Sequence, residues 1–444
     1  MTTVVNGGYT YVVFKDSTSI QLNHSAVDYV IIGGGGAGGN SHGGGGGAGG
    51  IVTGSLNAGK DTYSVVVGSG GDSASGDNSS MFGVTALGGG RGGGGDSGNA
   101  SDGGSGGGGS GYVTSTTGGT AIGSGLGNNG GNGFKDGGDG GAGGGGGGGG
   151  SGSVGSTAPV GGGTSCSGGV GGNGTTTLST WISVISSIMP TNWNAATSEG
   201  YIGGGGGGGS WGNPVVSGGS GGGGTGGTNN GSSGFITPTN GINYTGSGGG
   251  GGGSGAQLGA PGGSGLVIIR YIEYTCFKEG SKILTNKGYV PVEQLRKGDL
   301  IKTYLHHYLP IVLIGKSTIY NSGDNNRVKN RLYTLPKSEL PLLSEDLILT
   351  GCHSLLVDGL YHGQIEDMAG SSGRLYKIDD KLRLFTCFEP KAIPYPEEGF
   401  FTIYHFALEC DDDQINFGVW ANGLLVETSS IICLRDYSNM EFIE

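Results

Sequence analysis

The composition of the chain changes abruptly at the stretch TCFKEGSKILT, residues 275–285. Of the 112 glycines, 99 precede Cys276 and only 13 follow it, although the chain continues to residue 444. Glycine at this level, without a strict Gly-X-Y repeat and with only 12 prolines, excludes collagen. The later residues have an ordinary globular composition and enough length to bury a core. We therefore predict two domains, at residues 1–275 and 276–444.

Neither part carries the charge of a nucleic-acid-binding protein. The net charge is −12, with five Lys/Arg against eleven Asp/Glu up to Thr275 and 17 against 23 from Cys276 onward. An acidic chain without a basic cluster does not attract phosphate, so we expect no nucleic-acid partner. No stretch is apolar over the ~18 residues of a membrane span, and the N-terminus lacks the plan of a signal peptide. The sequence thus predicts no transmembrane segment.

The six cysteines follow neither a CxxC metal pattern nor a small disulfide framework. We read them as reduced thiols, most of them small core residues. A metal set of His306, His307, His362 and Cys352 lacks any ligand spacing, so no metal is expected. The many GxGxxG matches carry no information where glycine fills a third of the positions. No cofactor is predicted.

Four β-branched and aromatic runs bracket the glycine tracts, at residues 9–14, 27–32, 62–67 and 265–271. Between them lie homopolymeric glycine runs at 43–47, 143–150, 203–209 and 248–253. Such tracts are either flexible linkers or ordered polyglycine helices of the polyproline-II kind. Because a linker seldom needs such length or ends in apolar strands, we favour order. The predicted fold of residues 1–275 is a polyglycine-II-type helical sandwich on a small β base.

One insertion in the glycine-rich part has a helical pattern. Apolar residues recur at 178, 181, 182, 185, 188 and 189, on one helix face, and Pro190 follows as a stop. This segment is either a short helix packed on the glycine body or a helix that binds a partner.

From Cys276 onward the sequence predicts short strands separated by turns, and hence an all-β domain. Strand-like runs occur at 283–285, 289–292, 300–303, 311–314, 347–349, 355–357, 401–409 and 418–426. Residues 361–399 are more polar and irregular, and we expect them to form an inserted loop region.

Four features of the C-terminal part resemble, in order, the Hint (hedgehog/intein) self-processing domains. They are the leading Cys276-Phe277, the stretch from Gly288 to Asp299, the Thr350-x-x-His353 motif and the WANGLLV run at 420–426. The sequence around His353 resembles most the Hint domains of large DNA viruses. This resemblance implies a location in the virion or the host cytoplasm, and the sequence does not decide between them. Residues 1–272 resemble glycine-rich domains of phage tail and bacterial surface proteins, which implies a display module with a surface ligand.

The resemblance implies that Cys276 attacks the carbonyl of Thr275 in an N–S acyl shift. A thiol is strongly nucleophilic, and attack one residue back closes a five-membered ring. His353 is the proton donor for the departing amide nitrogen, and Thr350 orients the scissile peptide. His405 resembles the residue that serves the second step. Each has a plainer reading as well: a buried structural thiol, a core histidine, or a strand residue.

The sequence also departs from the family pattern. Inteins end in His-Asn, but Val426-Glu427-Thr428 stands here, so splicing is not expected. The tail is too short for the sterol-binding region of hedgehog proteins. What remains is a single-turnover autoprocessing reaction, in which a thioester is released to water, a thiol, an amine or a hydroxyl acceptor. The alternative is a structural or adhesive glycine-rich protein whose Hint domain is inert.

Overall fold

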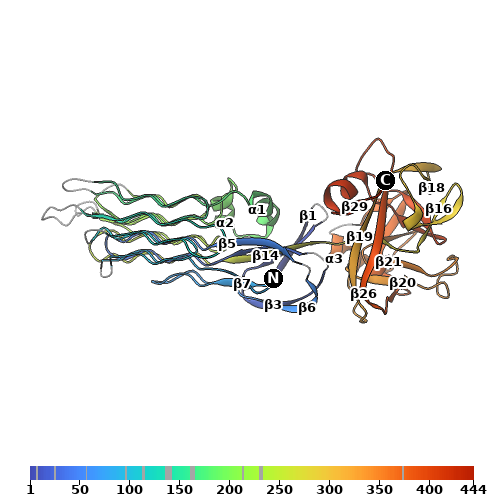
Figure 1. The fold of residues 1–444 in the computed structure, drawn as a ribbon, viewed down its shortest axis with the longest axis horizontal. Helices are drawn as coiled ribbons and strands as arrows, with labels where there is room; N and C mark the ends of the chain where they lie inside the picture. Colours follow the sequence, from blue (N-terminus) through green and yellow to red (C-terminus); the bar gives the residue numbers. More distant parts are fainter. Residues whose placement is uncertain are drawn as a thin grey trace.

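The computed structural model describes the 444 residues except 7–8, 25–26, 57, 96–97, 113–115, 136–142, 161–165, 213–214, 230–233 and 373–374. An elongated glycine-rich part lies at one end and a more compact part at the other (Figure 1). The described residues form a mainly β structure with few helices, as the sequence predicted.

A five-stranded antiparallel sheet joins the two ends of the glycine-rich part. Its order is β1 (Thr2–Asn6), β2 (Tyr9–Phe14), β14 (Leu266–Ile272), β4 (Val27–Ile32) and β5 (Ile51–Leu56). The last strand in sequence is central in space, because Ile268 of β14 lies opposite both Val13 and Val30. The predicted strands at 9–14, 27–32 and 265–271 are therefore present.

Alternate residues of this sheet pack on opposite faces, as a side-chain period of two requires. Tyr11 and Val13 join one apolar cluster, whereas Val12 and Phe14 join another. The first face is covered by α1 (Ser179–Ile185), which buries Trp181, Ile182 and Ile185. The predicted helix is thus confirmed. It continues as the 3-10 turn η1 (Ser186–Ile188), and after Pro190 a second helix begins, α2 (Thr191–Thr197).

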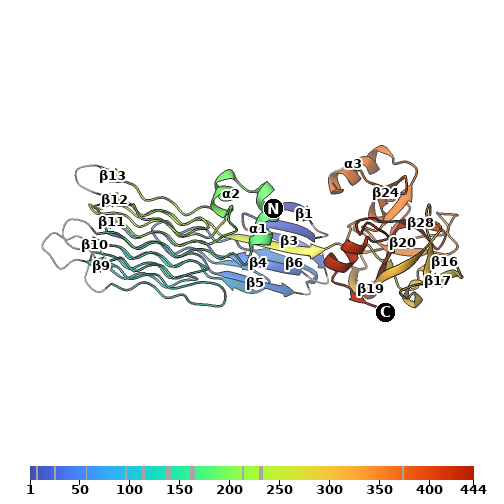
Figure 2. The same cartoon turned by 90° about the horizontal axis from the view of Figure 1, so that it is seen from above.

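The glycine tracts are extended segments that lie side by side and run away from the base sheet (Figures 1 and 2). Their backbone hydrogen bonds repeat every three residues. The first tract donates in rotation to three different neighbours at 2.8–2.9 Å. The nitrogens of 43, 46 and 49 donate to the carbonyls of 252, 249 and 246; those of 44, 47 and 50 to 93, 90 and 87; and those of 45 and 48 to 146 and 149. Interior segments are therefore bonded on several sides, whereas a β-strand is bonded on two.

Only glycine fits at most of these positions. A Cβ built on Gly148 would lie 2.0 Å from the carbonyl oxygen of Gly46, and one built on Gly45 would lie 2.0 Å from that of Gly206. The obstacle is backbone in both cases, so no side-chain rotation can relieve it. The homopolymeric runs thus follow from the close approach of neighbouring chains.

Short strand pairs complete the glycine-rich part. Five of these strands lie at the far end of the tracts in Figure 2: β9 (Phe134–Lys135), β10 (Gly143–Gly144), β11 (Ser210–Trp211), β12 (Thr228–Asn229) and β13 (Phe235–Ile236). The others lie beside the base sheet: β3 (Thr18–His24) pairs with β6 (Gly59–Val65), and β7 (Ser79–Met81) with β8 (Val84–Ala86).

The C-terminal part is one connected sheet system of fifteen strands around its own apolar core. Its strands are β15 (Phe277–Lys278), β16 (Lys282–Thr285), β17 (Gly288–Pro291), β18 (Leu300–Lys302), β19 (Tyr308–Ser322), β20 (Leu332–Leu335), β21 (Leu347–Thr350), β22 (Ser354–Val357), β23 (Lys377–Ile378), β24 (Lys381–Phe385), β25 (Ile393–Pro394), β26 (Glu398–Leu408), β27 (Gly418–Ala421), β28 (Leu424–Glu427) and β29 (Glu441–Phe442). Short helical turns are η2 (Val292–Gln294), η3 (Thr386–Phe388) and the π-helical turn η4 (Cys433–Tyr437).

The long antiparallel pair β19 and β26 supports the short strand β15, which begins at Phe277. Phe277 lies opposite Tyr404 of β26 on one side and Leu349 of β21 on the other. The residue after Cys276 is therefore held between two strands of the sheet system, β26 and β21.

The C-terminal part is not purely β, because an 11-residue helix, α3 (His362–Ser372), lies in the region expected to be an irregular loop. Of the side chains described in this helix, only Gln364 and Met368 are buried, one turn apart. Such a narrow contact leaves no apolar stripe from which a helical period could be read. β23 and β24 lie in the same region, while residues 373–374 are outside the described part.

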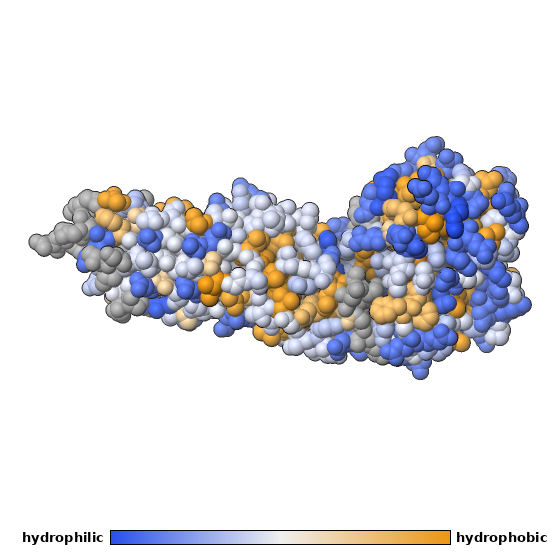
Figure 3. Space-filling model, in the orientation of Figure 1, coloured by the Kyte–Doolittle hydropathy of each residue, from blue (hydrophilic) through white to orange (hydrophobic). Residues whose placement is uncertain are grey.

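The two parts meet near the segment 273–276, where the side-chain amide of Asn439 lies 3.2 Å from the hydroxyl of Tyr9. Figure 3 shows hydrophilic residues concentrated on the C-terminal part. The surface of the glycine tracts is mostly of intermediate hydropathy. None of the described helices has the length and apolar character needed to cross a membrane.

Candidate active site

The peptide nitrogen of Cys276 is held by Thr350, the last residue of β21. It donates to the Thr350 hydroxyl at 2.8 Å, and the Thr350 backbone nitrogen donates to the Cys276 carbonyl at 3.0 Å. Thr350 is fully buried. The nitrogen of the Thr275–Cys276 bond is therefore fixed at a polar group inside an otherwise apolar surrounding.

The Cys276 side chain is buried in an apolar cluster that includes Ile403, Leu434 and Met440. Only 1% of the residue is exposed. Burial raises the pKa of its thiol well above the ordinary value, because the low-dielectric surrounding disfavours a thiolate. The sulfur is thus protonated at neutral pH, and its activation needs a nearby base.

The imidazole of His353 packs against Phe277, the residue that follows Cys276, with ring centroids 4.5 Å apart. Its own backbone nitrogen donates to Thr350 at 3.1 Å, so the turn after β21 places both motif residues together. Burial lowers the pKa of His353 to about 3; the backbone of Glu427 opposes this shift, and the Arg383 charge adds to it. Neither ring nitrogen meets hydrogen-bond geometry with any described residue.

His405 of β26 lies beside both of these rings. Its ring centroid is 5.6 Å from that of Phe277 and 5.3 Å from that of His353. Burial, together with the neighbouring His353, lowers the pKa of His405 to about 3. Both imidazoles are therefore neutral at physiological pH. The structure brings all four predicted side chains, Cys276, Thr350, His353 and His405, to one place.

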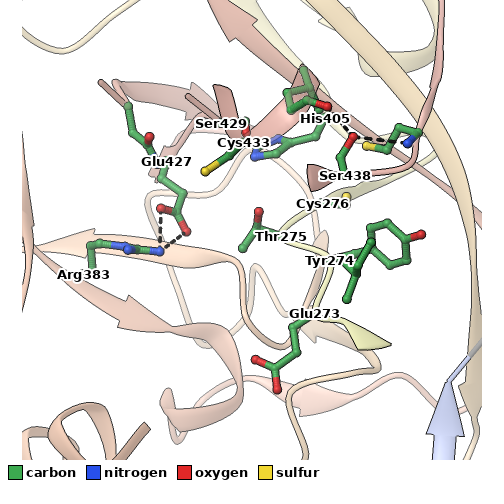
Figure 4. Close-up of a pocket in the computed structure, with 14 residues that line it drawn as sticks. Glu273, Tyr274, Thr275, Cys276, Arg383, His405, Glu427, Ser429, Cys433 and Ser438 are labelled. Atoms are coloured by element: carbon green, nitrogen blue, oxygen red, sulfur yellow. Dashed lines mark hydrogen bonds and ion pairs between the residues drawn. The ribbon is translucent and has the colours of Figure 1, made fainter. Parts of the chain in front are cut away.

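A cavity of about 210 Å³ borders the Thr275–Cys276 peptide. Thr275, His405, Glu427 and Cys433 are among its lining residues, and Figure 4 shows their side chains around it. The cavity gives a small molecule a place beside the scissile peptide.

An ion pair on the cavity wall was missed by the sequence reasoning. Glu427, 1% exposed, lies 2.9 Å from Arg383 of β24 and accepts a hydrogen bond from the Ser354 nitrogen at 2.8 Å (Figure 4). Arg383 falls in the region interpreted as an inserted loop, so no spacing pointed to it. By the sequence resemblance, Glu427 stands where inteins carry their terminal residues. That departure from the family pattern was the one feature of the sequence that pointed to Glu427.

The segment before the scissile bond is held by a second unpredicted contact. The Cys352 thiol donates to the Tyr274 carbonyl at 2.9 Å, and Glu273 pairs with Lys329 at 3.1 Å. Cys352 lies next to His353 in the same turn. The turn between β21 and β22 therefore touches the backbone on both sides of Thr275.

The described residues hold no group of three or more His, Cys, Asp and Glu side chains able to bind a metal ion. Of the histidines considered for such a set, His306 lies 3.4 Å from Asp379, and His362 lies 3.3 Å from Glu366 on α3. These contacts put the two histidines beside different carboxylates.

Two protein families match the chain. The family described as "Glycine-rich domain" matches residues 13–272, and the family described as "Hint domain" matches residues 275–430. Since the first match covers more than half of the chain, the protein belongs to the glycine-rich domain family. Its C-terminal part is a Hint domain, as the sequence motifs indicated.

The solved structures that resemble the chain include an intein and an intein-like domain. The crystal structure of the gp41-1 intein is 12% identical, with a TM-score of 0.20, and the match covers 34% of this chain and 98% of that one. The solution structure of a bacterial intein-like domain from Clostridium thermocellum is 13% identical, with a TM-score of 0.22, covering 35% and 99%. Likenesses this distant assign no residue roles. No curated protein matches the chain.

Proposed function

We propose that the protein is an autoprocessing precursor in which Cys276 cleaves its own bond to Thr275 and releases or transfers residues 1–275. The observation that carries the proposal is the 2.8 Å hydrogen bond from the Cys276 nitrogen to Thr350, with the neutral His353 ring packed edge-on against the adjoining residue, Phe277. The presence of a Hint domain supports the class of reaction.

In the first step the Cys276 sulfur forms a bond to the Thr275 carbonyl carbon, and the carbon–nitrogen bond breaks. The sulfur loses a proton and the departing nitrogen gains one, so the step is balanced internally. In this proposal the His353 imidazole, which packs against Phe277 beside the scissile bond, carries the proton from the sulfur to the departing nitrogen. Closing a five-membered ring makes this attack effectively unimolecular.

In the second step an acceptor attacks the thioester, and Cys276 leaves as a thiol. Water, a thiol, an amine and a hydroxyl compound are all chemically competent. His405 lines the cavity beside Thr275 and is neutral, which suits it to accept the proton of the incoming acceptor. We assign His405 to this step and Thr350 to holding the peptide in the first.

The released body, residues 1–275, is in this proposal a display module built from polyglycine-II helices. The three-residue period of its hydrogen bonds supports this assignment, since a polyglycine helix of that kind has three residues per turn and directs its backbone groups sideways. The proposed domain boundary is the same Thr275–Cys276 bond.

The test is incubation of the purified chain with dithiothreitol or hydroxylamine, followed by intact-mass analysis. We expect fragments that meet at Thr275 and Cys276, and none from Cys276→Ala. His353→Ala should slow the release about 10²- to 10⁴-fold, the usual range for a general acid–base. Cys410→Ala is the matched control, because Cys410 is a half-buried free thiol outside the cavity lining.

An intact wild-type chain under all of these conditions would contradict the proposal. It would favour the alternative of a structural or adhesive protein whose Hint domain is inert. Circular dichroism of each variant separates loss of chemistry from loss of fold.

A further inference from the structure

Three residues connect the last strand of the glycine-rich part to the nucleophile. Strand β14 ends at Ile272, and residues 273–275 line the same cavity as Cys276. We call these three residues the acyl tail. Because the acyl tail belongs to the part that the proposed reaction releases, contacts to its side chains give the Hint domain a means of selecting what it cleaves.

The first residue of the acyl tail, Glu273, forms an ion pair with Lys329. The carboxylate lies 3.1 Å from the Lys329 ammonium nitrogen, and only 20% of the lysine side chain and 21% of the glutamate side chain are exposed. Figure 4 shows the Glu273 carboxylate pointing away from Cys276. Arg383, the cation of the cavity lining, is paired with Glu427 instead. Lys329 therefore binds the acyl tail at a point remote from the reacting atoms.

The ammonium group of Lys329 has a defined position in the C-terminal part. Its nitrogen lies 5.2 Å from the centre of the Phe385 ring, which is within the range of a cation–π contact. The backbone before it is also held, because the Val328 carbonyl accepts a hydrogen bond from the Tyr333 hydroxyl at 2.9 Å. Glu273 thus meets a cation that the Hint domain itself keeps in place.

The backbone of Lys329 packs directly on the turn that holds the scissile peptide. The Gly351 nitrogen donates to the Arg331 carbonyl at 2.8 Å, and a Cβ built on Gly351 would lie 2.6 Å from the Lys329 carbonyl oxygen. Glycine is needed for this close approach. Gly351 follows Thr350, whose hydroxyl accepts the hydrogen bond of the Cys276 nitrogen. The site that binds Glu273 and the site that binds the scissile peptide are therefore joined rigidly.

The middle residue of the acyl tail is held by the same turn. Cys352 donates its thiol hydrogen to the Tyr274 carbonyl at 2.9 Å. Two consecutive tail residues are thus bound, one through its side chain and the next through its backbone. Sliding the tail by one residue would separate Glu273 from Lys329 and place a different carbonyl beside the Cys276 sulfur.

We infer that Lys329 is a specificity-determining residue, which favours acyl tails that carry a carboxylate three residues before Cys276. By holding that carboxylate, Lys329 sets the Thr275 carbonyl against the nucleophile. It acts through Glu273, so it is a positioning residue and not an acid or base of the reaction. Small displacements are enough to slow an intramolecular attack. The inference rests on the proposed autoprocessing function and names the feature by which the Hint domain recognises the part that it releases.

The experiment exchanges the two charges in the full chain and measures the single-turnover rate of release by dithiothreitol. Lys329→Glu brings two carboxylates together and Glu273→Lys brings two ammonium groups together, so each change should slow release about tenfold. The double variant, Glu273→Lys with Lys329→Glu, restores a pair of opposite charges and should recover most of the rate. A merely structural role of either side chain would give no such recovery.

A second readout is the preference for the residue at position 273. With Lys329 present, release should be fastest with the native Glu273, slower with Glu273→Gln and slowest with Glu273→Lys. In Lys329→Glu the order should reverse, and in Lys329→Arg it should be kept. The matched control is Lys282→Glu, which breaks an ion pair with Glu345 at 2.9 Å outside the cavity lining and should leave the rate unchanged. Circular dichroism checks the fold of every variant.

Two results would overturn the assignment of Lys329 and leave the proposed function standing. One is release from the double variant that is as slow as from the single variants. The other is an order of rates at position 273 that is the same with lysine, arginine and glutamate at 329. If the wild-type chain stays intact with both dithiothreitol and hydroxylamine, the proposed function fails and this inference fails with it.

Discussion

The two parts of the molecule are held together by different groups. In the glycine-rich part the tracts meet backbone to backbone, with hydrogen bonds in three directions and no room for a Cβ. In the C-terminal part a core of large apolar side chains surrounds a few buried polar groups. The first arrangement depends on the absence of side chains over long stretches, and the second depends on the identity of single residues. Adding a side chain should therefore destabilise the glycine-rich part, whereas removing a particular side chain should destabilise the C-terminal part.

The largest effect is expected from Gly148→Val in the glycine-rich part. The added Cβ would lie 2.0 Å from the Gly46 carbonyl oxygen, and neighbouring backbone would have to move. We expect a loss of more than about 3 kcal/mol, at or above the usual range for overpacking. Calorimetry should show the loss in the transition of the glycine-rich part alone. The matched control is Gly359→Ala, an exposed position with no atom within 4 Å of its added Cβ, which should leave both transitions unchanged.

The next largest effect is expected from removal of a particular side chain in the C-terminal part. Arg383→Leu leaves the carboxylate of Glu427, 1% exposed, without its cation, which should cost about 3 kcal/mol. Arg435→Leu removes an exposed cation that pairs with Asp413 and Asp436, and should cost much less, because exposed ion pairs contribute little. Chemical denaturation compares the two variants. If adding Glu427→Gln to Arg383→Leu restores no stability, the ion pair is not the cause.

A smaller effect should appear on acidification. His353 and His405 have folded-state pKa values of about 3, below the unfolded value near 6.5, so the unfolded chain binds more protons between these limits. Their contribution is complete above pH 6.5 and is lost as the pH falls toward 3. Denaturant titrations at stepped pH should show a shallower slope for His405→Phe. An unchanged slope in that variant would contradict the assignment.

The smallest effect concerns the contact before the scissile bond. Cys352→Ala removes the donor to the Tyr274 carbonyl, and a neutral hydrogen bond contributes about 1 kcal/mol, so cleavage should slow about fivefold. Cys352→Ser keeps a donor and should recover part of the rate. Single-turnover cleavage rates measure both variants; equal rates for alanine and serine would show that the hydrogen bond does not position the peptide.

Much of the architecture could be predicted from the sequence. The runs at 9–14, 27–32 and 265–271 are strands of one sheet whose alternate residues join two apolar clusters, and the helix predicted at 178–189 presents one apolar face. In the C-terminal part the Thr350 and His353 spacing was informative because a single turn places both residues. Local patterns with a strong period or a fixed spacing can be read without knowledge of the fold.

The remainder depended on contacts between distant segments. Arg383 meets Glu427 across 44 positions, and Cys352 meets Tyr274 across 78, so no local pattern joins either pair. The helix α3 buries too few side chains to show a period. Which glycine tract neighbours which cannot be read from runs of identical residues, because every register looks alike in the sequence.

The central place of β14 has a consequence for the order of events during synthesis. The base sheet cannot close until Ile272 has left the ribosome, because its middle strand is the last to be made. Only three residues separate that strand from Cys276. The glycine body can thus close before translation of the C-terminal part is complete. A cut after Thr275 would leave it with every strand in place and a three-residue tail.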